Sequence, residues 1–100
     1  MKTIPLSKPI NKGDQEITSI TLDFNSLKGS DLIKAEQECR LDGNVSLQPF
    51  YTSHGQAYVA AKASGLVPED IMDLAAPDFI QVTTEVSNFL YGWISPVNNQ

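Results

Sequence analysis

The stretch that decides the fold is APDFIQVTTEVSNFLYGWI, residues 76–94. At 100° per residue, its large apolar side chains fall within one arc of a helical wheel and its polar side chains fall opposite. The apolar arc comprises Phe79, Val82, Val86, Phe89, Leu90, Trp93 and Ile94. This spacing predicts a long amphipathic helix, which Pro77 suits because its missing N–H would be unpaired in the first turn anyway. Burying five of these side chains would contribute about 8–15 kcal/mol of gross transfer free energy, so we expect the rest of the fold to pack on this helix.

A second apolar band lies beside that arc on the same predicted helix. It contains Ile80 and Tyr91, and Ile94 borders both bands. Either a neighbouring helix of the same chain covers the band, or the band is an exposed patch for a partner. Under the second hypothesis Ile80, Tyr91 and Ile94 are the partner-facing residues, in a contact where one helix lies in the groove of another protein.

The beginning of the chain predicts a β-hairpin. Residues 3–7 are typical of a short edge strand, residues 8–15 of a connection, and residues 16–24 alternate apolar and polar side chains as a strand does. A lone hairpin is marginal in water, so a helix is expected to cover its apolar face.

Three further helices are expected between the hairpin and the long helix. The first spans residues 30–41 with Ser30 as its N-cap. The second spans 53–64, with Thr52 or Ser53 as its cap and Gly65 as its helix-ending residue, and is lined by alanines that allow close helix approach. The third is a short helix over 68–74. The predicted fold class is α+β, with an N-terminal β-hairpin packed on a bundle of three to four helices.

Composition limits the function classes. The 100 residues suit one domain, which we assign to residues 1–94, with 95–100 as a flexible tail. The net charge of −5 argues against nucleic acid or an anionic membrane as a partner. Cys39 is the only cysteine, so an internal disulfide is excluded and a reducing cytoplasm fits best. No run of apolar residues has the length of a signal peptide or a membrane span.

Few residues in the chain suit catalysis or cofactor binding. His54 is the only histidine and is best interpreted as a surface residue, and Cys39 as a small hydrophobe on the inward stripe of a helix. A Cys39–His54 nucleophile pair is a minor alternative. Four carboxylates near two helix starts suit the helix dipole better than a cation site, and they are Glu69, Asp70, Asp73 and Asp78. We therefore expect no cofactor, no metal site and no enzyme.

The order of these parts resembles the small tail assembly chaperones of long-tailed bacteriophages. In the first half the likeness lies in KPI (8–10), EITSITLDF (16–24) and LKGSDL (27–32). In the second half it lies in AAKASGLVPEDIMDL (60–74), PDF (77–79) and VSNFL (86–90). These motifs are structural rather than catalytic and span roughly residues 4–91.

The resemblance implies a non-catalytic protein of the infected or lysogenic bacterial cell. Such a protein coats the tape measure protein, keeps it soluble and helps recruit tail tube subunits. It then leaves, so it is absent from the mature virion, and it can form homo-oligomers. One alternative is a small structural protein of the virion, either a head–tail or a tail component. Another is a regulatory or antitoxin-like module, which would more often carry a basic DNA-reading segment that this chain lacks.

Overall fold

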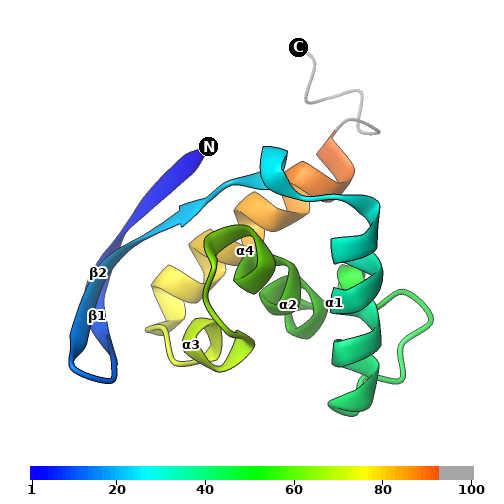
Figure 1. The fold of residues 1–100 in the computed structure, drawn as a ribbon, viewed down its shortest axis with the longest axis horizontal. Coiled ribbons are helices and arrows are strands. Elements are labelled where there is room, and N and C mark those ends of the chain that lie inside the picture. Colours follow the sequence, from blue (N-terminus) through cyan, green and yellow to red (C-terminus); the bar gives the residue numbers. More distant parts are fainter. Residues whose placement is uncertain (93–100) are drawn as a thin grey trace.

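The computed structural model describes residues 1–92 and confirms an α+β fold, in which an antiparallel hairpin precedes four α-helices (Figure 1). The elements are β1 (Lys2–Lys12), β2 (Gln15–Leu22), α1 (Gly29–Leu41), α2 (Ser53–Ser64), α3 (Pro68–Met72) and α4 (Ala76–Tyr91), with 3₁₀ turns η1 (Phe24–Ser26) and η2 (Pro49–Tyr51). The hairpin lies along one flank of the helices, and α4 contacts both β1 and α2. The predicted tail at 95–100 lies outside the described residues, as do Trp93 and Ile94.

The hairpin is longer than predicted, because the connection expected at residues 8–15 is mostly strand. β1 continues to Lys12, and a two-residue loop that begins with Gly13 leads into β2. Gly13 has a φ of 63°, and glycine in the first loop position with positive φ is the feature of a type II′ turn. The pairing register shifts between Pro5 and Ile10, so an irregular segment interrupts β1 where the sequence suggested that the strand ended.

The second strand ends earlier than predicted, at Leu22 rather than at Phe24. The next backbone N–H, that of Asp23, donates a hydrogen bond to the carbonyl of Ala63 on α2, at 2.9 Å. This bond turns the chain away from the hairpin and into η1. Ile20 and Leu22 are buried on the face that the helices cover, which confirms that the hairpin needs a helical layer.

The core is organised around α2, which corrects the prediction that the fold packs on the long helix. Residues 55–61 are all buried, because α1, α3, α4 and η2 each pack against this helix. Its alanines and Gly55 have little side chain, so neighbouring backbones can approach closely. Of the two predicted caps, the structure selects Thr52, whose hydroxyl accepts a hydrogen bond from the Gly55 N–H at 3.0 Å. The predicted end at Gly65 is confirmed, with a φ of 76°.

Helix α4 is amphipathic as predicted, but its buried face is narrower than the wheel suggested. Val82 and Val86 are fully buried, whereas Phe79 is only partly covered. Phe89 is 37% exposed, so the prediction that it is a core residue is wrong. It lies at the edge of the apolar arc, where its ring stacks on that of Phe24 at a centroid distance of 4.5 Å.

The first helix begins before the predicted cap. It starts at Gly29, and the backbone N–H of Lys28 donates to the carboxylate of Asp31 at 2.9 Å, so the Ser30 cap is wrong. The short helix α3 starts at Pro68 as predicted and ends at Met72, within the usual spread of helix boundaries.

Candidate interaction surface

The apolar band beside the main arc of α4 is the surface that the sequence suggested for partner binding. We call it the outer stripe, and in the structure it comprises Ile80, Thr84, Ser87 and Tyr91. Ile80 is 62% exposed, so no neighbouring helix of the described chain covers it. Thr84, one turn further along, is exposed as well, and Ser87 is half-buried. Residues spaced by three and four positions share one helix face, so this stripe runs along α4 with Ile80 as its large apolar member.

Tyr91 and Ile94 differ from Ile80. The Tyr91 ring packs at 4.8 Å against that of Tyr51 in η2, so the protein's own chain covers part of it. Burial, and then the neighbouring Tyr51, raise the pKa of the Tyr91 phenol. Ile94 lies outside the described residues. Of the three candidate residues, the structure therefore leaves Ile80 most open, places Tyr91 in an internal contact, and does not describe Ile94.

An apolar groove opens beside Ile80 at the start of α4. It has a volume of about 290 Å³ and is lined by Met72, Leu74, Ala76 and Phe79. Ala76, which lines the groove, lies one turn before Ile80 on the same face of α4, so the exposed isoleucine neighbours the groove along the helix. The volume is slightly below the roughly 300–1,000 Å³ of small-molecule pockets, which suits a single anchoring side chain better than a cofactor.

Among residues 1–92, the connection between α1 and α2 carries the most exposed aliphatic side chains, which the sequence did not lead us to predict. Val45 is 92% exposed and Leu47 is 93% exposed, whereas the polar residues between and before them are half-buried. The Asn44 side chain accepts from the Ser46 N–H at 2.9 Å, and Arg40 donates to the Ser46 carbonyl at 2.9 Å. The alternation of polar and apolar residues could have indicated this segment, but not which residues face inward.

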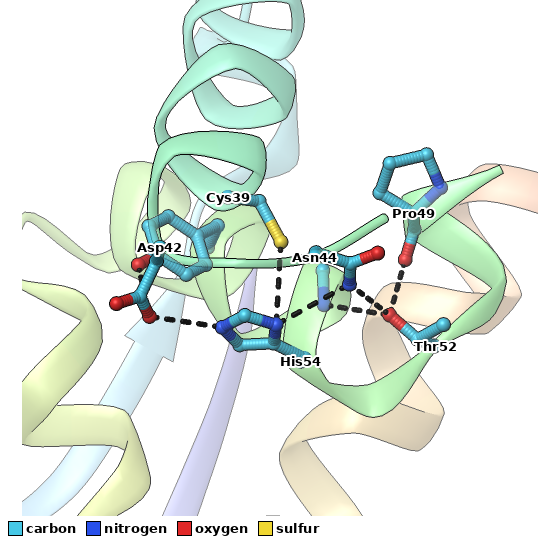
Figure 2. Close-up of polar contacts among 8 residues, drawn as sticks. Cys39, Asp42, Asn44, Pro49, Thr52 and His54 are labelled. Atoms are coloured by element: carbon cyan, nitrogen blue, oxygen red, sulfur yellow. Dashed lines mark hydrogen bonds and ion pairs between the residues drawn. The ribbon is translucent and has the colours of Figure 1, made fainter. Parts of the chain in front are cut away.

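His54 forms a polar network that joins α1 to α2, which corrects its interpretation as a simple surface residue. Figure 2 shows its ring between the Cys39 thiol and the Asp42 carboxylate, with Nδ1 at 3.6 Å from the sulfur and Nε2 at 3.0 Å from the carboxylate. With its proton on Nε2, the ring donates to Asp42, and Nδ1 accepts from Cys39 and from the Asn44 amide at 3.2 Å.

The Cys39–His54–Asp42 arrangement has the order of a thiol catalytic triad but lacks an accessible nucleophile. Cys39 is fully buried, and burial raises the pKa of its thiol, so the sulfur stays protonated rather than forming a thiolate. The hydrogen bonds from His54 and then Tyr58 lower the pKa of the Asp42 carboxyl. The network is therefore best interpreted as structural, since its hydrogen bonds join α1 to α2.

A second groove, of about 380 Å³, lies between the end of α1 and the start of α3. Its lining combines carboxylates with apolar and aromatic groups: Glu38, Leu41, Asp42, Tyr58, Pro68 and Glu69. Leu41 is 88% exposed at this groove. The Tyr58 hydroxyl donates to Asp42 at 2.8 Å. Burial, followed by this hydrogen bond and by the negative charges of Asp42 and Glu69, raises the pKa of Tyr58 far above its usual range.

Two of the four carboxylates near the helix starts hold the hairpin. Asp70 forms an ion pair with Lys12 at 2.8 Å, and this contact lowers the pKa of the Asp70 carboxyl. Asp78 accepts hydrogen bonds from backbone N–H groups of β1. Within residues 1–92, the structure contains no group of three or more side chains arranged to hold a metal ion. No helix in this part of the chain is long and apolar enough to cross a membrane.

Comparison with known proteins identifies the family to which the chain belongs. The family model described as "Phage tail assembly chaperone proteins, E, or 41 or 14" matches residues 3–91, nearly the whole chain. The chain therefore belongs to this phage tail assembly chaperone family, whose role is non-enzymatic. Comparison with curated proteins and with solved structures finds no match for the chain.

Proposed function

We propose that this protein binds and solubilises the tape measure protein through the outer stripe of α4. The observation that carries the proposal is Ile80, 62% exposed beside the apolar groove between α3 and α4. Contiguous exposed apolar surface on a folded domain marks interaction sites. A long polypeptide kept soluble before assembly would need its apolar side chains covered, and this surface offers such cover.

The groove defines the type of contact. Of its lining residues, Met72 and Ala76 are exposed and Leu74 is buried. An amphipathic helix of the partner can place one apolar side chain in the groove and the next against Ile80, as helix-in-groove complexes do. Tyr91, at the other end of the stripe, already contacts Tyr51, so we give it a supporting role.

Membership of the family supports a wider role, which is also part of the proposal. We infer that the protein also helps recruit tail tube subunits, acts in the cytoplasm of the host and is absent from the mature virion. Mass spectrometry of purified particles tests the last point, because a structural virion protein would remain in the particles in stoichiometric amounts.

The tape measure contact can be tested by co-expressing the chain with its cognate tape measure protein and measuring the soluble fraction. We expect Ile80→Ser to lower that fraction and to weaken pull-down of tape measure fragments by about tenfold, the loss of one buried aliphatic side chain. Val45→Ser is the matched control, because Val45 is equally aliphatic, 92% exposed and not on α4.

Both variants should unfold at the wild-type urea concentration, since exposed positions contribute little to stability. If a folded Ile80→Ser protein keeps the tape measure protein as soluble as wild type does, the α4 contact is wrong.

A further inference from the structure

We propose that the groove between α1 and α3 is a second docking surface, which takes a basic side chain carried on an apolar segment of another polypeptide. The groove combines carboxylates of Glu38, Asp42 and Glu69 with the exposed Leu41. This surface is separate from the stripe on α4, so the inference does not depend on the tape measure contact.

The charges of the groove are only partly neutralised within the chain. Lys62 forms an ion pair with Glu38 at 3.1 Å, whereas Glu69 has no ion-pair partner among the described residues. Asp42 accepts from His54 and from the hydroxyl of Tyr58. An incoming Lys or Arg can therefore complete the charge balance, with Glu69 as the open carboxylate.

The apolar part of the groove excludes a simple cation as the best occupant. Leu41, 88% exposed, lines the groove from α1, and Pro68 lines it from α3. An occupant that gains from both features presents an apolar side chain next to a positive one. An amphipathic helix provides this combination within one or two turns, and an extended segment provides it within a few residues.

Charge also selects among classes of macromolecule. The phosphates of nucleic acids and of anionic lipids would be repelled by this groove. A second copy of the chain would bring its own net charge of −5 toward the same acidic surface. A basic segment of a different polypeptide is the occupant that complements the groove.

The probe is a synthetic amphipathic peptide built from Leu and Lys, with a Leu/Glu peptide of the same pattern as its counterpart. Each is titrated into the full chain and followed by amide and methyl NMR shifts, and the dissociation constant is measured by calorimetry. We expect the Leu/Lys peptide to shift the resonances of Leu41 and Glu69, and its binding to weaken as salt screens the charges.

Variants separate the two contributions. Leu41→Ser, which preserves the charge of the groove, should weaken binding by about tenfold through lost apolar contact. Glu69→Gln should weaken it by about two- to fivefold, the range of an exposed ion pair. Val45→Ser and Ile80→Ser are controls on other surfaces and should bind as wild type does.

Three results would overturn the proposal. The first is equal binding of the Leu/Glu peptide, and the second is shift changes confined to residues outside the groove. The third is a folded Leu41→Ser protein that binds the Leu/Lys peptide as tightly as Val45→Ser does. A failure of Ile80→Ser to affect tape measure solubility would leave this inference untouched, because the two tests use different surfaces.

Discussion

Asp78 in the first turn of α4 accepts a hydrogen bond from the backbone N–H of Ser7 in β1, and both carboxylate oxygens lie 3.0 Å from the Ser7 nitrogen. The Ser7 hydroxyl adds a bond at 3.1 Å, and the Lys8 N–H adds one at 3.3 Å. These donors belong to the irregular segment between Pro5 and Ile10, where β1 and β2 are out of register. A carboxylate from a helix therefore accepts the hydrogen bonds of this segment and ties the hairpin to α4.

Because the Asp78 carboxylate must be charged to accept these hydrogen bonds fully, the free energy of unfolding depends on pH. The bonds from Ser7, first of all from its backbone N–H, hold the pKa of Asp78 below its usual range. A carboxyl with a lowered folded-state pKa stabilises the fold above its unfolded pKa of about 3.9 and loses that effect as pH falls through the folded value. We expect the free energy of unfolding, measured with urea, to fall below about pH 4.

Asp78→Asn should destabilise the protein near neutral pH and flatten the acid dependence, because the amide does not titrate. Asp14→Asn, in the exposed hairpin loop, is the control and should follow the wild-type curve. An Asp78→Asn protein with the wild-type stability and acid profile would show that these hydrogen bonds contribute nothing.

Gly55 is required by the close approach of η2 to α2. A Cβ at this position would lie well inside van der Waals contact of the Pro49 carbonyl oxygen, a backbone atom that cannot rotate away. We expect Gly55→Ala to cost about 1–3 kcal/mol by overpacking, or more if η2 must detach. Gly29→Ala is the matched control in α1, since a Cβ there meets nothing within 4 Å. Equal urea midpoints for the two variants would contradict this account.

Asn44 holds the exposed connection against α2. Its amide donates to the Thr52 hydroxyl at 3.1 Å and to His54, and its oxygen accepts from Ser46. Removing it leaves the partly buried Ser46 N–H without its acceptor and takes one hydrogen bond each from Thr52 and His54, so Asn44→Ala should lower the free energy of unfolding by about 1–3 kcal/mol. Faster amide hydrogen exchange around Ser46 should accompany the loss. Asn25→Ala, at an exposed position, should change stability by less than about 0.5 kcal/mol.

Cys39 should be protected from thiol reagents in the folded state. It is fully buried, and burial raises the pKa of its thiol, so both access and thiolate formation are restricted. We expect alkylation by iodoacetamide to be slow in buffer and to become rapid in urea above the unfolding midpoint. Rapid stoichiometric alkylation of the native protein would mean that the Cys39–His54 contact is open and reactive.

Local patterns predicted much of the fold. The helical period of residues 76–94, the cap at Thr52 or Ser53 and the end at Gly65 all depend on neighbours within a few positions. The helix is confirmed over residues 76–91, the cap is Thr52, and Gly65 ends α2. The predicted extent of β1 was wrong, because the carboxylate of Asp78, which accepts hydrogen bonds from the irregular segment of this strand, lies some seventy residues away in the sequence. No local pattern contains that partner.

The candidate surfaces also differ in how far the sequence could predict them. The position of Ile80 outside the apolar arc could be predicted, because a helical wheel shows which side chains leave that arc. Whether a neighbouring helix covers it could not, and the structure leaves it exposed. The acidic groove could not, since its residues come from α1, α2 and α3 and meet only when these helices pack.

By itself the sequence determined the type and order of the main elements, the amphipathic character of α4 and the family, because these follow from local periodicity and motif order. Tertiary structure alone decided that α2 rather than α4 lies at the centre. It also decided that Tyr91 meets Tyr51 and that His54 bridges Cys39 and Asp42. The physical reason is that burial and long-range hydrogen bonds depend on which elements pack together, and small side chains such as those of α2 allow the closest packing.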